Sequence, residues 1–156
     1  MHEYEHTQPG TFMRAMTGLW VVIFVVGSVV MLALGGQEVA GAVIPGIVML
    51  AVFTAIIAAL FHSLTVRISP SDIAISFGVG LIRKRFPISD IRSVRIARNR
   101  WYNGFGIRKI RGGWLYNVSG FDAIEIQLKN ERKYRIGTDQ PKKLLAAVES
   151  ALAGPS

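Results

Sequence analysis

The sequence predicts a membrane α-helical hairpin followed by a mainly β domain that ends in one amphipathic helix. Three observations support this prediction. The first 61 residues contain two apolar runs of membrane-spanning length. From Leu64 onward apolar and polar residues alternate, which is the period of a strand with one buried face. After Pro141 the apolar residues take up helical spacing.

The charged residues are segregated along the chain. Of the 156 residues 51% are hydrophobic and the mean hydropathy is +0.37, yet the formal net charge is +8. Up to Phe61 one basic residue, Arg14, stands against three glutamates; from His62 onward seventeen Lys and Arg stand against seven Asp and Glu. The length allows about one ordinary domain. We therefore expect the part of the chain from His62 onward to form one basic domain that attracts acidic lipid, nucleic acid or an acidic protein surface.

The two apolar runs predict helices at residues 17–34 and 39–61, because roughly 20 apolar residues cross a hydrocarbon core of about 30 Å. Between them residues 35–38, Gly-Gly-Gln-Glu, predict a tight polar turn and hence an antiparallel hairpin. A cleaved signal peptide is the alternative for the first run. Signal peptides begin with basic residues, whereas this chain begins Met-His-Glu-Tyr-Glu-His, which disfavours that alternative.

Flanking charges predict the orientation of the hairpin. Arg14 precedes the first run, Arg67 follows the second, and the turn has neither Lys nor Arg. Since Lys and Arg mark the cytoplasmic side, we expect a multi-pass protein of the cell (inner) membrane with both termini cytoplasmic. Residues 1–16 would form a cytoplasmic tail and 62–153 a cytoplasmic domain. Neither run contains an ionisable residue, which disfavours a channel or transporter.

Small residues suggest where the two helices touch. Ala51, Ala55 and Ala59 recur at every fourth position, and Gly27 and Ser28 offer a flat spot on the first run. Small residues at this spacing let helices approach closely in lipid. The alternative is that alanine is simply common in such helices.

About seven short strands are expected after the second span. Two hairpins are predicted, one from residues 64–68 and 73–77 around Ser-Pro-Ser-Asp, and one from residues 123–129 and 132–136 around Asn-Glu. The other predicted strands cover residues 81–86, 91–98 and 114–118.

The last element is a helix that follows the capping sequence Thr-Asp-Gln-Pro at 138–141. Its apolar positions are Leu144, Leu145, Val148 and Leu152, which share one face of a helix. We expect that face to close the core of the β domain.

Several short motifs accompany these elements: Phe-Pro-Ile-Ser-Asp-Ile at 86–91, Gly-Phe-Gly-Ile-Arg at 104–108, Gly-Gly-Trp at 112–114, Gly-Phe-Asp-Ala-Ile-Glu-Ile at 120–126 and Ile-Gly-Thr-Asp at 136–139. They resemble the bacterial pleckstrin-homology family, whose members are often preceded by two transmembrane helices. The resemblance covers residues 61–152. It implies a PH-like bent barrel of about seven strands capped by a C-terminal α-helix, and a binding or scaffolding module without catalytic residues to carry over.

The usual ligand loop of that wider fold is not basic in this chain. Phosphoinositide-binding members hold phosphates with a basic loop between the first two strands, whereas residues 69–72 here are Ser-Pro-Ser-Asp. The candidate surface for anionic lipid or a partner therefore consists of other residues: Arg83, Arg85, Arg98, Arg100, Trp101, Arg108, Lys109 and Arg111. Alternation places Arg83 and Arg85 on one face of their strand and Lys84 on the other. The alternative is that such charges simply face solvent.

Residues 99–113 combine Trp101, Tyr102 and Phe105 with four glycines and several basic side chains. A long loop of this kind suggests a ligand-binding surface, a loop that dips into lipid or, least favoured, a nucleic-acid platform. The alternative is a barrel corner in which glycine supplies backbone freedom and tryptophan fills the core. We expect weak binding to anionic vesicles through Arg108, Lys109 and Arg111, without headgroup preference.

Metal, cofactor and catalytic centres are not expected. The chain has no cysteine, so thiolate ligands and a cysteine nucleophile are absent. His2, Glu3, Glu5 and His6 carry donor atoms, but they lie in a short tail without rigid surroundings. No Ser or Asp has a recognisable catalytic partner.

The function expected from these patterns is a membrane-anchored, non-enzymatic binding or scaffolding module. The basic domain would lie at the inner leaflet, with anionic headgroups, a protein partner or a second copy of the chain as its partners and no nucleic acid. The alternative is an accessory subunit of a membrane enzyme or transport complex.

Overall fold

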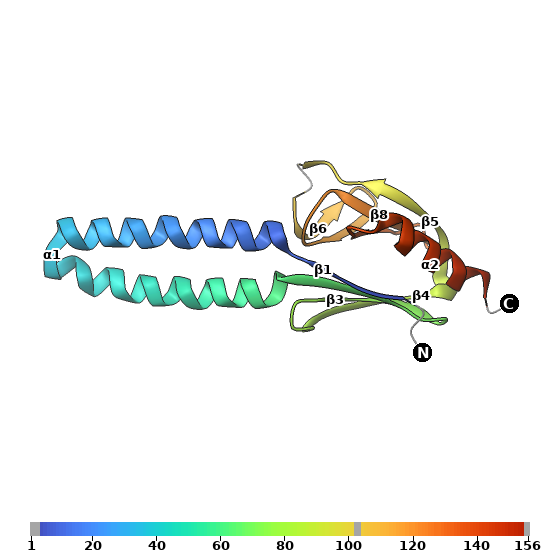
Figure 1. The fold of residues 1–156 in the computed structure, drawn as a ribbon, viewed down its shortest axis with the longest axis horizontal. Coiled ribbons are helices and arrows are strands. Elements are labelled where there is room, and N and C mark those ends of the chain that lie inside the picture. Colours follow the sequence, from blue (N-terminus) through green and yellow to red (C-terminus); the bar gives the residue numbers. More distant parts are fainter. Residues whose placement is uncertain (1–3, 102–103, 155–156) are drawn as a thin grey trace.

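A computed structural model describes residues 4–101 and 104–154, apart from the side chains of residues 36–38, 40 and 42. Figure 1 shows two long helical segments lying side by side, with two β-sheets and a short helix at one end of them. The helical segments and the β domain therefore occupy separate parts of an elongated molecule.

The helical segments are the two halves of α1 (Thr11–Phe61). A straight helix of 51 residues would hold its ends about 75 Å apart. Instead, the amide of Gly10 donates to the carbonyl oxygen of His62 at 2.7 Å, so the helix reverses direction (Figure 1). The predicted antiparallel hairpin is confirmed. Helical conformation begins at Thr11, and it continues through residues 35–38, where we expected a polar turn.

The halves of α1 contact each other only in part. Two grooves of about 360 and 400 Å³ lie between them, and Gly27, Ser28 and Gly46 line the second. Ser28 is buried, whereas Ala51 and Ala55 are exposed. The alanine stripe is therefore not the contact between the two halves.

The first sheet is antiparallel in the order β1-β2-β3-β4, with β1 (Tyr4–Pro9), β2 (Ser63–Ile68), β3 (Asp72–Phe77) and β4 (Ile82–Pro87). The predicted β2–β3 hairpin is confirmed, with Val66 opposite Ile75. The expected N-terminal tail contains β1, which pairs with β2 along its whole length. Its less exposed side chains are Tyr4, His6 and Gln8. A strand with such an inner face shows no hydrophobic alternation.

The second sheet has the order β5-β8-β9-β7-β6. It contains β5 (Ile91–Arg98), β6 (Gly106–Ile110), β7 (Gly113–Asn117), β8 (Asp122–Leu128) and β9 (Lys133–Gly137), and η1 (Ile88–Asp90) joins it to β4. The β8–β9 hairpin was predicted, whereas β6 lies inside the region expected to be a basic loop. The described chain thus has nine strands rather than about seven. β7 and β9 pair in parallel, and the other pairs are antiparallel.

The two sheets do not close into a barrel, so the bent barrel expected from the resemblance is not observed. Strands β1, β4, β5 and β6 remain at the edges of their sheets. Closure requires edge strands to pair with each other, and β4, β5 and β6 carry arginine and lysine side chains that disfavour such pairing.

The core lies between the sheets and is closed by α2 (Pro141–Ala153). Both sheets contribute fully buried aliphatic side chains, such as Ile75 and Ile126. Helix α2 packs on β5, β8 and β2 and buries Leu144, Val148 and Ala151. The predicted helix is confirmed, although Ala151 takes the buried position and Leu152 is 37% exposed.

Candidate functional site

The β domain joins α1 without a linker. β1 ends at Pro9 and β2 begins at Ser63, and these two residues are register partners at the helix ends. The turn between β3 and β4 also contacts the helix, because the amide of Val79 donates to the carbonyl oxygen of Ala59 at 3.2 Å. The position of the domain relative to α1 is therefore fixed by backbone hydrogen bonds.

Side chains from both sheets reinforce this junction. Phe12, in the first turn of α1, stacks on Phe105 with ring centroids 3.9 Å apart, and Phe61 meets Phe77 edge to face at 5.7 Å. The hydroxyls of Thr11 and Ser119 are hydrogen-bonded at 2.7 Å. The first half of α1 thus contacts loops of the second sheet, and Phe61 of the second half contacts Phe77 of the first sheet and lies beside Gly106 of the second.

A polar groove runs along the outer face of the first sheet. Arg67 of β2 and Arg83 and Arg85 of β4 point to this face, since alternate residues of a strand share a face. The groove has a volume of about 330 Å³, and its lining residues are Thr65, Arg67, Ala74, Ile75, Ser76, Gly78, Val79, Gly80, Arg83 and Arg85. It begins at the β3–β4 turn, next to the end of α1. We call it the arginine groove.

The three arginines differ in their partners. Arg67 forms an ion pair with Glu5 at 2.9 Å, and the Arg85 guanidinium lies 4.0 Å from the carboxylate of Asp72. Arg83 instead donates through Nε to the carbonyl oxygen of Gly80 at 2.5 Å. Among the described residues, no carboxylate forms an ion pair with Arg83, and a neutral carbonyl does not compensate its positive charge. The end of the groove nearest α1 is therefore its most positive part.

The remaining candidate residues lie in the second sheet or in the segments next to its strands. Arg98 ends β5, where it is the register partner of Asp122, and Arg100 and Trp101 follow it and are exposed. Arg98 is therefore in a different sheet from Arg83 and Arg85, and Arg100 and Trp101 lie in the segment that follows β5.

Arg108, Lys109 and Arg111 are exposed but do not form one loop. Arg108 and Lys109 are consecutive residues of β6 and therefore point to opposite faces of the sheet. β6 begins beside Phe61, and Arg111 lies just beyond its far end, about 13 Å along the strand. The three charges are thus spread over two faces of the second sheet. Arg108 lies toward the α1 end of β6, because it donates through Nε to the carbonyl oxygen of Phe105 at 3.2 Å and Phe105 stacks on Phe12, whereas Arg111 lies at the far end.

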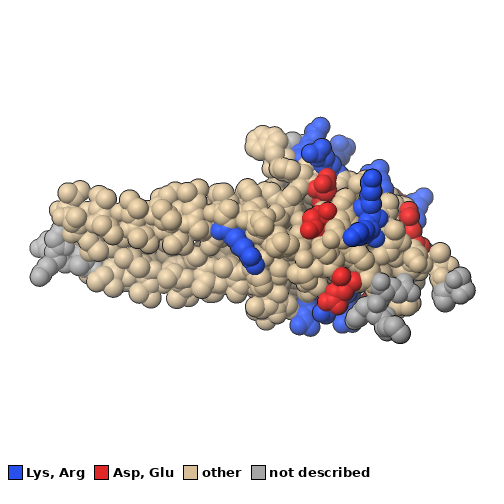
Figure 2. All heavy atoms as spheres, in the orientation of Figure 1, with Lys and Arg blue, Asp and Glu red and all other residues tan. Residues whose placement is uncertain are grey.

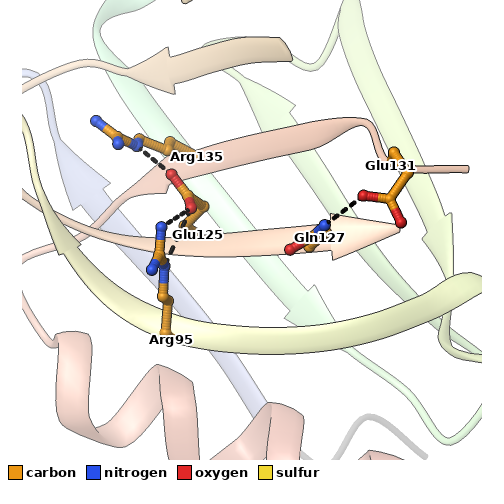
Figure 3. Close-up of polar contacts among 5 residues, drawn as sticks. All are labelled: Arg95, Glu125, Gln127, Glu131 and Arg135. Atoms are coloured by element: carbon orange, nitrogen blue, oxygen red, sulfur yellow. Dashed lines mark hydrogen bonds and ion pairs between the residues drawn. The ribbon is translucent and has the colours of Figure 1, made fainter. Parts of the chain in front are cut away.

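A buried glutamate was not recognised as special in the sequence. Glu125 of β8 is only 4% exposed, and Figure 3 shows it between Arg95 of β5 and Arg135 of β9. Arg95 donates through Nη2 to Oε1 at 2.5 Å, and Arg135 donates through Nε to Oε2 at 2.7 Å. Glu125 alternates with Ile124 and Ile126, which are in the core, so it lies on the outer face of β8 and is buried there by its cross-strand neighbours.

The pKa of Glu125 lies below its ordinary value. Burial acts to raise this pKa, but the hydrogen bonds from Arg135 and Arg95 and their positive charges outweigh burial. Glu125 is therefore ionised at neutral pH, and it neutralises part of the basic charge of the second sheet. This arrangement stabilises the sheet and does not resemble a catalytic acid with a raised pKa.

Among the described residues, no group of three or more His, Asp and Glu side chains is arranged to hold a metal ion. Of the N-terminal donor residues, His2 and Glu3 lie outside the described part. Glu5 pairs with Arg67, and His6 Nε2 lies 2.6 Å from the carboxylate of Asp139.

No family model, curated protein or solved structure matches this chain. The resemblance to the bacterial pleckstrin-homology family therefore rests on sequence motifs alone. The structure supports the coarser description of two apolar helical segments attached to a two-sheet β domain.

Proposed function

We propose that this chain is a membrane-anchored, non-enzymatic binding module whose arginine groove holds an anionic lipid headgroup. Support begins with α1, of which Thr11–Gly35 and Val43–Phe61 are long and apolar enough to cross a membrane. These segments are almost entirely uncovered by the rest of the chain. Apolar surface exposed to water costs about 25 cal/mol per Å², so a bilayer is the more favourable environment.

The charge distribution supports placing the domain at the cytoplasmic leaflet. Figure 2 shows Lys and Arg gathered on the domain and nearly absent from the helices. Arg14 lies in the first turn of α1, and Arg67 lies in β2, six residues after the other helix end. Positive residues that flank short spans are retained on the cytoplasmic side. That leaflet carries the anionic lipids to which a basic domain is attracted.

The arginine groove is the observation that carries the proposal. Guanidinium groups bind phosphate oxygens through paired, charge-assisted hydrogen bonds. Arg83 of β4 lies three residues beyond Gly80 of the turn that contacts the helix end, and no carboxylate of the described part of the chain pairs with it. Arg67 and Arg85 continue the groove away from α1. A headgroup phosphate beside the hairpin is thus close to Arg83, with further donors along the groove.

The test compares two pairs of arginines in the full-length protein in mild detergent. Thermal unfolding is followed with short-chain phosphatidylglycerol or phosphatidylcholine added. The anionic lipid should raise the melting temperature more, because a ligand that binds only the folded state stabilises it. Arg83→Gln with Arg85→Gln should remove this difference, and high salt should weaken it by screening.

The matched control is Arg108→Gln with Arg111→Gln, which removes the same charge from the second sheet. This variant should keep the preference for the anionic lipid. An equal loss in both variants would show attraction to net charge alone. A loss in the control alone would locate binding at β6 instead, as the sequence had suggested.

A further inference from the structure

Among the described residues of the β domain, the three most exposed large hydrophobic side chains occur beside the ends of α1. Val79 and Leu81, in the β3–β4 turn, are 61% and 78% exposed, and Trp101 is 80% exposed. Figure 2 shows uncharged side chains protruding on both sides of the helices where these meet the domain. Val79 and Leu81 are exposed together in one turn, and exposed apolar side chains that lie together are typical of an interaction surface.

The β3–β4 turn is held rigidly against the helix. Gly78 has a φ of +48°, and a Cβ there would lie 2.0 Å from the carbonyl oxygen of Ala59. Gly80 has a φ of +83°, and its carbonyl oxygen accepts a hydrogen bond from Arg83. Val79 and Leu81 are therefore presented by an ordered turn.

Trp101 belongs to a segment on the opposite side of the hairpin. The amide of Gly104 donates to the carbonyl oxygen of Trp101 at 3.3 Å, and the next residue, Phe105, stacks on Phe12 of α1. The first sheet thus holds one exposed apolar group beside the second half of α1. The second sheet holds another beside the first half.

The register of the hairpin gives the depth of both groups. Gly10 lies opposite His62, and both halves rise by the same distance per residue, so Arg14 lies about level with Ala59. A charged side chain at the end of a span reaches into the headgroup layer. Val79 is hydrogen-bonded to Ala59, which lies about level with Arg14. Phe105 stacks on Phe12, which precedes Arg14 by two residues. Both groups are therefore at headgroup level.

We propose that the β3–β4 turn and the Trp101 segment insert Val79, Leu81 and Trp101 into the interfacial layer of the same leaflet. Tryptophan prefers this layer, where its ring is in apolar surroundings and its N–H meets water. Two insertions on opposite sides of the hairpin fix the angle of the domain to the membrane. They also hold the end of the arginine groove nearest α1 against the headgroups. This inference rests on the proposed membrane location of α1.

The three tryptophans of the chain provide the test, because they lie at different levels. Trp20 is exposed on α1, Trp101 is at the junction, and Trp114 is near the end of β7 farthest from α1. Variants with two of the three replaced by Phe are reconstituted in vesicles, and quenching by phosphatidylcholine brominated near the top of its acyl chains is measured. Leu81→Trp, with all three natural tryptophans replaced by Phe, reports on the other group.

Trp20, Trp101 and Leu81→Trp should be quenched, and Trp114 should not. If Trp20 is quenched but Trp101 and the tryptophan of Leu81→Trp are not, this inference is wrong and the anchored hairpin still holds. Absence of quenching at Trp20 would overturn both proposals. Protection of Trp101 from acrylamide without lipid quenching would show that protein covers it, which also contradicts insertion.

Discussion

Glu125 shows how one side chain determines the charge of a surface. Arg95 and Arg135 approach it from neighbouring strands, and its carboxylate compensates part of their charge (Figure 3). The outer face of the second sheet is therefore less positive than its arginine content suggests. In the arginine groove the two arginines farther from α1 are paired with Asp72 and Glu5, and Arg83 bonds to the carbonyl oxygen of Gly80.

Glu125→Gln should reduce the free energy of unfolding by about 1–3 kcal/mol, because it leaves two arginines without their buried carboxylate. Since the folded-state pKa of Glu125 is lowered, its contribution is complete above the unfolded pKa of about 4.3. The contribution is lost as pH falls through the folded value. The free energy of unfolding of the variant should therefore decrease less at acidic pH than that of the wild type. Denaturant unfolding at several pH values measures this difference. Glu131→Gln, at an exposed site, is the control; an equal effect there would contradict a special role for Glu125.

Gly113 is required by the close parallel approach of β7 and β9. A Cβ at this position would lie 1.5 Å from the carbonyl oxygen of Lys133, so backbone would have to move. Gly113→Ala should destabilise the domain by roughly 3 kcal/mol or more in thermal unfolding. Gly27→Ala should have little effect, because nothing lies within 4 Å of the place that its Cβ would take. A Gly113→Ala protein as stable as the wild type would show that this strand pairing is wrong.

At the scale of elements, the edge strands limit how a partner can bind. β4, β5 and β6 each carry at least two Lys or Arg side chains and sit at sheet edges. Charged edges disfavour the addition of a further strand. A protein partner is therefore not expected to add a strand at these three edges. The fourth edge, β1, carries no Lys or Arg and is not protected in this way.

Helix α2 is required to close the core between the sheets. Val148→Asp should abolish cooperative unfolding of the β domain, because it places a charge at a fully buried position. Ala146→Asp lies on the exposed side of the same helix and should leave unfolding nearly unchanged. Near-UV circular dichroism during thermal unfolding of the full-length protein distinguishes the two. A cooperative transition in Val148→Asp would refute the packing of α2.

At the scale of the whole molecule, apolar and charged surfaces occupy different ends (Figure 2). The apolar end is the hairpin, and the charged end is the β domain, which is bonded directly to both helix ends. Because no flexible linker separates them, a change in helix tilt would also tilt the arginine groove.

The proposed topology predicts different accessibility for the two ends. A reporter fused to the C-terminus should register as cytoplasmic, because Arg14 and Arg67 flank the spans. A single cysteine placed at Gln37, in a chain that has no other cysteine, should react with an impermeant reagent from outside the cell. A C-terminus on the outer face would contradict the positive-inside argument.

Local patterns in the sequence determined the parts of the fold whose contacts are local. The apolar runs, the β2–β3 and β8–β9 hairpins and α2 depend on neighbouring residues, so period and turn composition were sufficient to predict them. The sequence also identified Arg83 and Arg85 as sharing one face.

Only the tertiary structure decided the parts that depend on distant residues. β1 is a strand because β2 pairs with it, and β6 is a strand because β7 pairs with it. The arginine groove combines β4 with Arg67 of β2, and the burial of Glu125 depends on β5 and β9. Such contacts join residues far apart in sequence. Their free energy comes from cross-strand pairing and burial, and neither has a signature in local periodicity.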